Sequence, residues 1–433
     1  MSQIVAVPTR RSAVIRRAVG ALFTTLLVTS VLMSTGRASG PIFDAPVLLR
    51  GSSNASEPVI KIAPDGSIFV SPIFGIPTHS PMWRSTDGGL TFKQLTFQAP
   101  YNRLPGGGDS DVVVVPHPNG QTNRVYFLDL WLGSNSISVS EDNGTTWTRG
   151  TPITSLPLSD RQWMAVGERD PKTGLDTVFV IYRLVNQPGW VMVARSRDGG
   201  MTWDHHARVV SNSGRYPPGQ LVGDGKKFLI TSYVKGGNLH TARSSDEGAT
   251  WDDGAATYEG NLLDGSMASI TRDPITGDLY MPMVDVDRQV LVTKSTDNGE
   301  SWSWPTLVSA AVGEPDAGSN VFPWIAARNG KVAVAWYGTE DWTGDPNGAT
   351  GANWFVEYVE SIDGGQTWTS ETHPIATPAR VGHICTLGLS CQSGRDLGDF
   401  MQLTINDAGL SVLATVSPSG TLVTTQCRET GCA

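Results

Sequence analysis

Short runs in which apolar and polar residues alternate recur along the chain, as in Lys331–Trp336. A period of two is typical of β-strands that bury one face. These runs occur in pairs joined by a Gly or Asn turn, and seven such strand–turn–strand units are present. They begin near Glu57, Asp109, Asp160, Pro217, Gly265, Val321 and Asp399. The pattern therefore predicts an all-β protein assembled from repeated hairpins.

A second repeat comes after six of the hairpins. It is an eight-residue segment of the form Ser-x-Asp-x-Gly-x-Thr/Ser-aromatic, with copies that begin at Ser85, Ser140, Ser196, Ser244, Ser295 and Ser361. In such a segment the Asp carboxylate accepts backbone N–H groups, the Gly supplies a positive φ, and the aromatic ring packs back against the turn. We therefore assign the six aspartates to structure. They lie 48 to 66 residues apart, which is the size of one four-stranded propeller blade.

The last hairpin lacks this eight-residue segment. After the seventh unit, 400–416, there is one further strand at 419–424 and then the chain ends, so one strand of a four-stranded blade is missing. The segment Phe43–Leu49 resembles the stretches at the ends of the other repeats, such as Trp302–Val308, and can supply that outer strand. We therefore predict a seven-bladed β-propeller closed by the N-terminal strand. A six-bladed ring with an extra C-terminal hairpin is the alternative.

Residues 1–40 differ from the rest because four arginines precede the apolar stretch Ala18–Met33, after which small residues occur around Ala38. This order predicts a signal peptide. The stretch has 16 residues, fewer than a spanning helix needs, and an uncleaved anchor is the alternative. The pair Arg10-Arg11 leaves twin-arginine export open. We therefore expect residues 41–433 to form a single secreted propeller domain, located outside the cell, in the periplasm or at the cell surface.

Without residues 1–40 the chain has 27 Lys plus Arg and 41 Asp plus Glu, a net charge of −14. This charge argues against nucleic acid or an anionic membrane as a partner, and we expect a monomer. An exported protein meets an oxidising environment, so the four cysteines predict two disulfides near the C-terminus. The cysteines are Cys385, Cys391, Cys427 and Cys432. The two local pairs are the simplest of three pairings, and a four-cysteine zinc site is the rival.

The six-fold repeat is the hallmark of the Asp-box, or BNR-repeat, β-propellers, and the chain resembles their sialidase-like members over nearly all of its mature length. It looks closer still to secreted bacterial BNR-repeat proteins, with features such as Asp160–Trp163. The resemblance implies the fold but no single function, because such boxes occur in sialidases, other glycosidases, polysaccharide lyases and non-enzymatic propellers. Sialidases begin a three-arginine clamp with Arg-Ile-Pro on the first inner strand. Here that place reads Glu-Pro-Val at 57–59, with only Lys61 nearby, which argues against ordinary exo-sialidase activity.

In a propeller, the start of each inner strand and the loop after each second strand gather at one end of the central channel, opposite the Asp boxes. Glycan chemistry needs one carboxyl group that donates a proton, another that attacks or activates water, and aromatic rings that stack on sugars. The candidate catalytic residues are Asp109, Asp111, Asp160, Arg161, Tyr337 and Glu340. The candidate substrate-binding residues are Glu57, Arg215, Tyr216, Arg395, Asp399 and Trp131. The alternative is structural: strand-start carboxylates pair with arginines of neighbouring blades and tie the blades together.

Two further features bear on this end of the channel. Three glycines precede Asp109 and Asp111. The backbone carbonyls of this loop and the two carboxylates are candidate ligands for one Ca²⁺ ion. The alternative is that the glycines only let the backbone approach the channel or a ligand. No organic cofactor is required. Two long insertions, Thr339–Trp354 and Thr372–Asp399, flank the sixth blade. We expect them to wall one side of a substrate pocket, stiffened by the first disulfide.

The sequence has no phosphate-binding loop, dinucleotide-binding fingerprint, His-Glu-x-x-His motif or nucleophile elbow. The leading hypothesis is an extracellular, sialidase-like and exo-acting glycoside hydrolase that uses carboxylates at the channel. Two alternatives stay open. One is a non-catalytic propeller that binds glycans or proteins, and the other is a polysaccharide lyase with a Tyr/His or Tyr/Arg pair.

Overall fold

The computed structural model describes residues 40–427 with short gaps, and these residues lie in one compact unit. The gaps are 76–77, 79–80, 96–106, 132–133, 155–158, 188, 211–216, 255, 261, 264–266, 310–317 and 343. The described part contains β-strands and two short 3₁₀-helices, η1 (Pro346–Gly348) and η2 (Gly388–Ser390). None of its helices is long and apolar enough to cross a lipid bilayer.

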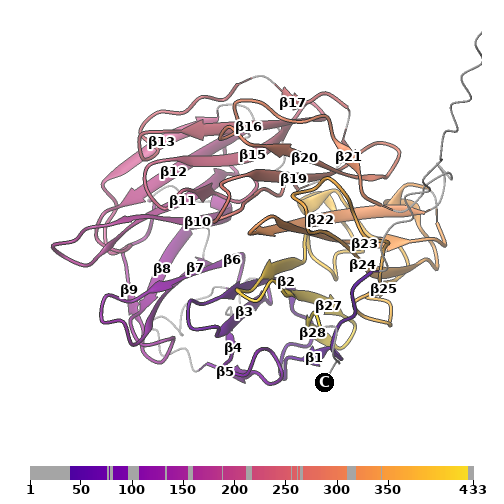
Figure 1. Cartoon of the computed structure of the whole chain (residues 1–433), viewed down its shortest axis with the longest axis horizontal. Coiled ribbons are helices and arrows are strands. Elements are labelled where there is room, and N and C mark those ends of the chain that lie inside the picture. The colour runs from indigo at the N-terminus through magenta and orange to yellow at the C-terminus, as the bar shows by residue number, and fades with distance from the viewer. Residues whose placement is uncertain are drawn as a thin grey trace, which may run out of the picture. The chain divides into compact units, whose positions relative to one another are not determined.

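The strands form seven four-stranded antiparallel sheets, which are the blades of a β-propeller (Figure 1). Blade 1 contains β2 (Ser56–Ile62), β3 (Ile68–Ile73), β4 (Trp83–Ser85) and β5 (Lys93–Gln94). Blade 2 contains β6 (Ser110–Pro116), β7 (Asn123–Trp131), β8 (Ser134–Ser140) and β9 (Thr148–Arg149). Blade 3 contains β10 (Ser159–Arg169), β11 (Asp176–Leu184), β12 (Trp190–Ser196) and β13 (His205–Val210). In each blade the first strand is the innermost.

The remaining blades have the same order. Blade 4 contains β14 (Val222–Gly223), β15 (Leu229–Lys235), β16 (Asn238–Ser244) and β17 (Ala256–Tyr258). Blade 5 contains β18 (Thr271–Arg272), β19 (Leu279–Val284), β20 (Val290–Ser295) and β21 (Thr306–Leu307). Blade 6 contains β22 (Ser319–Arg328), β23 (Lys331–Thr339), β24 (Asn353–Ser361) and β25 (Arg380–Val381). Blade 7 contains β26 (Gln402–Ile405), β27 (Ser411–Ser417), β28 (Gly420–Thr425) and β1 (Val47–Leu48).

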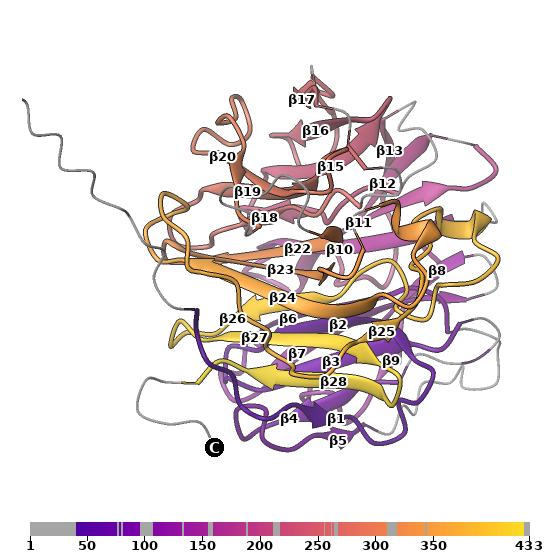
Figure 2. The same cartoon turned by 90° about the vertical axis from the view of Figure 1, so that its right-hand side faces the viewer.

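The N-terminal strand completes the last blade, as predicted. In this blade β1 pairs with β28, with Val47 opposite Val423 and Leu48 opposite Leu422. The inner strand β26 contacts β2 of the first blade, so the ring closes (Figures 1 and 2). Closure of this kind joins the two ends of the chain and removes the exposed edges of an open array of sheets. The seven-bladed prediction is confirmed, and the six-bladed alternative is wrong.

The second strand of a blade is buried on both faces, because neighbouring blades cover it from either side. In β23 the residues Ala333 and Ala335 pack into one apolar cluster, whereas Val332, Val334 and Trp336 pack into another. All five side chains are fully buried. The alternation in the sequence therefore separates two core interfaces rather than a buried face from a solvated face.

The Asp boxes are turns between the third and fourth strands, and their aspartates have the expected structural role. In the first box Asp87 accepts hydrogen bonds from the Thr91 N–H at 3.0 Å and from the Ser85 hydroxyl at 2.7 Å. Its bonds, led by the one from the Thr91 side chain, lower the pKa of Asp87 to about 2. The Asp87 carboxylate is therefore ionised at neutral pH, and its hydrogen bonds stabilise the turn.

Candidate functional site

Three inner strands begin with an irregular turn that departs from the sheet register. Glu57 on β2, Arg161 on β10 and Phe322 on β22 have positive φ values of 49°, 42° and 54°. The register of each strand shifts at this point, which marks a β-bulge. A positive φ is strained for residues other than glycine and occurs where the surrounding structure enforces it. As a result the side chains of Glu57 and Arg161 meet across the channel, although blades 1 and 3 are not neighbours.

Arg161 is the centre of an ionic cluster that joins three blades. Its side chain is 3% exposed. Its Nη2 atom donates to the Glu57 carboxylate of blade 1 and, at 2.9 Å, to Asp109 of blade 2. The backbone N–H of Arg161 also donates to Asp109, at 3.0 Å. The Nη1 atom is buried and has no hydrogen-bond partner in the described part of the chain.

A second arginine joins blade 7 to the same cluster. Arg395 donates to Asp399 at 2.7 Å and lies 3.6 Å from Glu57. The backbone N–H of Asp399 donates to the same Glu57 oxygen, Oε1, at 3.1 Å, whereas Arg161 bonds to Oε2. We call the set Glu57, Asp109, Asp160, Arg161, Arg395 and Asp399 the channel-mouth cluster. The inter-blade pairing that the sequence left as an alternative is therefore present.

Aromatic rings lie beneath the cluster. The Arg161 guanidinium lies 5.1 Å from the Trp163 ring and 4.6 Å from the Phe400 ring. Trp324 stacks on Phe400 with ring centroids 5.0 Å apart and lies 5.7 Å from Trp163. These three rings, the aromatic floor, close the channel below the charges. They keep the local dielectric low, so the electrostatic interactions above them are strong.

Burial makes several carboxyl groups of the cluster hold protons more tightly than usual. It raises the pKa of Glu57 to about 8, with Arg161 opposing the shift and Asp399 and Asp109 adding to it. Burial also raises the pKa of Asp160 to about 6. The negative charge of Asp109 and a hydrogen bond between the two side chains add to that shift, while Arg161 and Arg183 oppose it.

Asp109 and Asp160 form a pair of neighbouring carboxyl groups at the channel mouth. Asp160 lies opposite Arg183 in the β10–β11 ladder and is hydrogen-bonded to Asp109. The Asp109 side chain is 13% exposed, whereas Asp399 and Arg395 are 26% and 29% exposed. With its pKa raised to about 6, Asp160 therefore offers an exchangeable proton beside charged groups that solvent can reach.

The pKa of Glu57 predicts how stability depends on pH. The folded protein keeps a proton on Glu57 that the unfolded chain releases above its ordinary pKa of 4.5. The contribution of this group to stability therefore falls as pH rises from 4.5 to about 8 and is constant outside that window. We expect the Glu57→Gln variant to lose less stability over this range than the wild type, as measured by urea unfolding at several pH values. Glu168→Gln, at an exposed site on β10, controls for loss of one carboxylate. Equal slopes for Glu57→Gln and wild type would contradict the assignment.

Asp111 lies apart from the channel-mouth cluster, further along the channel. A cavity of about 250 Å³ there is lined by residues from all seven inner strands, including Asp111 and Lys61. Burial raises the pKa of Asp111. Its Oδ1 atom lies 4.0 Å from the Lys61 ammonium and accepts the N–H of Val112, and its Oδ2 atom accepts the N–H of Met164. Lys61 thus pairs with this buried carboxylate.

The proposed Ca²⁺ ligands do not share one centre in this structure. The carboxylate of Asp109 faces Arg161, whereas that of Asp111 faces Met164 and Lys61. Among the described residues, no group of three or more His, Cys, Asp or Glu side chains is placed to hold a metal ion. The arrangement of these two residues therefore does not fit a common cation.

The other candidates have different surroundings. Tyr337 is fully buried and its hydroxyl lies 2.9 Å from that of Thr415 in blade 7, and burial raises its pKa to about 12. Glu340 is exposed after the end of β23. Trp131 ends β7, but its side chain lies outside the described part. Arg215 and Tyr216 also lie outside the described residues.

The two insertions beside blade 6 support each other. The Asn347 side chain, in η1, donates to the Thr386 hydroxyl at 3.1 Å and accepts its N–H at 3.0 Å. A disulfide joins Cys385 and Cys391 as predicted, and Arg380 pairs with Asp396. The second insertion then delivers Arg395 and Asp399 to the channel mouth. Cys427 is disulfide-bonded too, whereas Cys432 lies outside the described residues.

The aromatic floor was not among the residues proposed from sequence. Trp324 comes directly after the bulge at Phe322-Pro323, just as Val59 comes after the bulge at Glu57-Pro58. This shared non-glycine-proline pair at two inner-strand starts is a local signal for the bulge. Neither it nor any other pattern in the chain indicates that Phe400 of blade 7 stacks on Trp324, because that contact joins different blades.

Residues 134–335 match a family model described as a BNR repeat-like domain, in agreement with the resemblance seen in the Asp boxes. No curated protein matches the chain. An α-L-arabinofuranosidase from Fusarium graminearum is 14% identical over 91% of this chain and 99% of its own, with a TM-score of 0.46. The Aleuria aurantia lectin is 12% identical over 77% and 98%, with a TM-score of 0.47. A Hadza microbial sialidase is 16% identical over 80% and 73%, with a TM-score of 0.41. At these identities and TM-scores the likenesses carry no argument about function.

Proposed function

We propose that this BNR-repeat-like propeller is a secreted glycoside hydrolase of extracellular glycans and that Asp160 is its proton donor. The observation that carries the proposal is the Asp109–Asp160 pair at the channel mouth, in which burial and the charge of Asp109 raise the pKa of Asp160 to about 6. A general acid works best when its pKa lies near the operating pH. The disulfide between Cys385 and Cys391 and the apolar segment near the N-terminus support export.

The other members of the cluster have complementary roles in this proposal. Glycoside hydrolysis needs a second carboxylate that attacks the sugar or activates water. Asp399 is the candidate for that role because it comes from blade 7 and bonds to Arg395; burial raises its pKa, and Arg395 and Arg161 oppose the shift. Arg395, 29% exposed, can bind substrate oxygens. Glu57 and Arg161 are buried positioning residues that hold Asp109 in place.

A non-catalytic propeller is the second candidate, and one observation favours it. Glu57 and Arg161 are at most 4% exposed and bond to each other. The same cluster therefore also holds blades 1, 2 and 3 together. The lyase alternative receives less support, because the Tyr337 phenol is fully buried and its pKa is raised to about 12. A base for proton abstraction must be reachable by the substrate.

The test is to incubate purified residues 41–433 with sialosides and with plant and bacterial polysaccharides, identifying the products by mass spectrometry. We expect saturated sugars with new reducing ends. Unsaturated products would show a lyase instead. If the folded protein turns over none of these substrates, the hydrolase proposal fails for them and the binding propeller is favoured.

A further inference from the structure

A second polar pocket lies between blades 4 and 5, at the end of the blades that carries the Asp boxes. Its volume is about 320 Å³. It is lined by Thr241, Arg243, Asp252, Gly254, Ala256, Thr257, Gly299, Glu300, Ser301 and Trp302. The third strand of a blade runs away from the channel mouth towards its Asp box, so this pocket is separate from the channel-mouth cluster.

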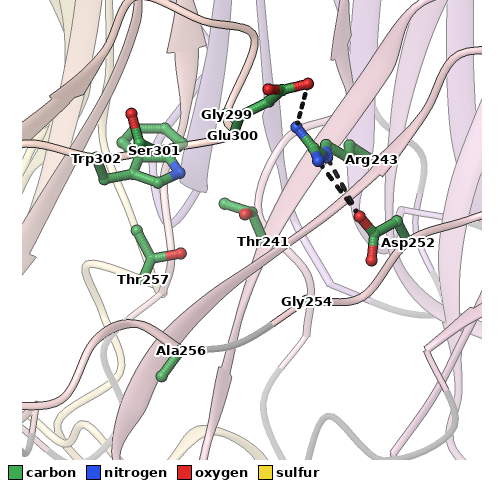
Figure 3. A pocket seen from close by; sticks show the side chains of 10 residues that line it. All are labelled: Thr241, Arg243, Asp252, Gly254, Ala256, Thr257, Gly299, Glu300, Ser301 and Trp302. Atoms are coloured by element: carbon green, nitrogen blue, oxygen red, sulfur yellow. Dashed lines mark hydrogen bonds and ion pairs between the residues drawn. The ribbon is translucent and has the colours of Figure 1, made fainter.

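The pocket has an ion-pair wall and an aromatic wall. Arg243 lies 3.4 Å from both Asp252 and Glu300. Figure 3 shows these ion pairs on one side of the pocket and Trp302 on the other, with Thr241 between them and Thr257 below Trp302. Within the described part of the chain, the indole N–H of Trp302 has no hydrogen-bond partner. By contrast, the corresponding tryptophans at 147, 251 and 368 donate to a glycine carbonyl of their own box.

The neighbouring interface, between blades 3 and 4, shows how this pocket arises. There Arg195 and Asp204 occupy the places of Arg243 and Asp252, and Arg195 lies 3.5 Å from Glu247. A second arginine, Arg197, bridges Asp204 and Glu247. In blade 4 the residue at that place is Ser245, which is too short to form such a bridge. The ion pairs of Arg243 therefore border open space.

The outer strand of blade 4 enlarges that space. In blade 3, β13 begins at His205, directly after Asp204, and His206 pairs with Ala194. In blade 4 the residues after Asp252 are Asp253 and Gly254, which belong to no strand, and β17 begins only at Ala256. Glycine at the place of His206 removes a large side chain. The pocket thus results from particular substitutions rather than from the blade repeat.

The lining chemistry identifies the ligand class. Asp252 and Glu300 are 64% and 69% exposed acceptors, and Arg243 is a donor of planar, paired hydrogen bonds. Three hydroxyl side chains accept or donate, and the Trp302 ring offers an apolar surface for C–H groups. Two carboxylates against one guanidinium leave an excess negative charge, which disfavours anionic ligands.

We propose that this pocket, formed by Arg243, Asp252, Glu300 and Trp302, binds a neutral sugar residue of a glycan, independently of the channel mouth. A propeller with such a site holds its substrate, or the surface that bears it, at a second point, and the effective concentration at the channel mouth rises. The site does not depend on the hydrolase proposal, because a non-catalytic propeller would use it in the same way.

The test uses saturation-transfer NMR on residues 41–433 with methyl glycosides of glucose, galactose, mannose, xylose and N-acetylglucosamine, and with sialyllactose as the anionic comparison. We expect transfer to at least one neutral glycoside. Arg243→Met should weaken that binding about tenfold or more, because one charge-assisted hydrogen bond is lost. Thr257→Trp, which fills the pocket from an outer strand, should weaken it as well.

Two matched variants separate this site from its alternatives. Arg195→Met removes the corresponding arginine of the neighbouring interface, and Asp407→Asn removes the charge of an exposed carboxylate; both should bind the glycoside like the wild type. The proposal is overturned if no neutral glycoside shows transfer, if sialyllactose alone does, or if Arg243→Met and Thr257→Trp bind normally. Loss of binding in Asp160→Asn but not in Arg243→Met would place the sugar at the channel mouth instead.

Discussion

Replacing Asp160 with Asn is expected to lower kcat/KM by about 10²- to 10⁴-fold on a glycan that the wild type hydrolyses, the usual contribution of a positioned general acid. The amide keeps the size of the side chain and can still donate to Asp109, but it cannot transfer a proton to the leaving oxygen. Because the pKa of Asp160 is about 6, the wild-type kcat/KM should fall above that pH. The measurement is initial rate against pH for both proteins.

The leaving group gives this prediction a sharper control. A glycoside with an acidic phenol as leaving group needs little protonation, so Asp160→Asn should lose far less activity on it than on a natural glycan. Asp407→Asn, at an exposed turn near Arg328, should behave like the wild type on both. Equal losses on both substrates, or an unchanged pH profile, would remove Asp160 from the role of acid.

Replacing Arg161 with Met is expected to lower the free energy of unfolding by about 3 to 5 kcal/mol, the cost of breaking a buried ion pair from one side. The change leaves Glu57 buried without its main charged partner and takes two donors from Asp109 and Glu57. The part of the loss that involves Glu57 should be constant below its wild-type pKa of about 8, where both folded proteins hold the proton, and should grow above that pH. Urea or thermal unfolding at two pH values measures both effects.

Arg395→Met provides the matched comparison, since this arginine contacts the same Glu57 but is 29% exposed. We expect it to cost about 1 kcal/mol or less, as exposed pairs do. The double variant Arg161→Met with Glu57→Gln should recover part of the stability above pH 4.5, because the amide is neutral at every pH, whereas the single variant must keep a proton on Glu57 that its unfolded chain releases. A single Arg161→Met variant as stable as Arg395→Met would show that the bonds of Arg161 between blades 1, 2 and 3 contribute little to the free energy of unfolding.

Stability and reactivity compete within the channel-mouth cluster. Arg161 and Glu57 sit in strained backbone conformations and are paired, whereas Asp160 keeps a raised pKa. Strain and unfavourable charge burial of this kind persist at functional sites because the surrounding structure compensates for them. A propeller supplies that compensation through the closure of its ring.

Local chemistry explains which features were predictable. An Asp box is closed by bonds within a few residues, such as that from Thr91 to Asp87, so each copy can be recognised without knowledge of the rest. The same holds for the hairpins and for the disulfide between Cys385 and Cys391, whose partners are six residues apart. Placing Glu57, Asp109, Asp160 and Asp399 at one end of the channel required only the repeat order.

The sequence did not indicate which residues of the site contact one another. Tyr337 and Asp111 share the strand-end pattern of Asp160, but packing buries the first against Thr415 and turns the second towards Met164. The pocket at Arg243 exists because blade 4 has Ser245 where blade 3 has Arg197. The sequence alone does not reveal this effect, because the ion pairs that Arg197 makes join two neighbouring blades.

The sequence by itself determined the repeated four-stranded blades and the structural role of the Asp boxes, because both result from bonds between near neighbours or from repeat spacing; it favoured seven blades, and the pairing of β1 with β28 decided that number. Only the tertiary structure decided that Arg161 joins Glu57 to Asp109 and that burial raises the pKa of Asp160 to about 6. Those properties depend on burial and on charges from four different blades, and distances between blades are set by the packing of the whole ring.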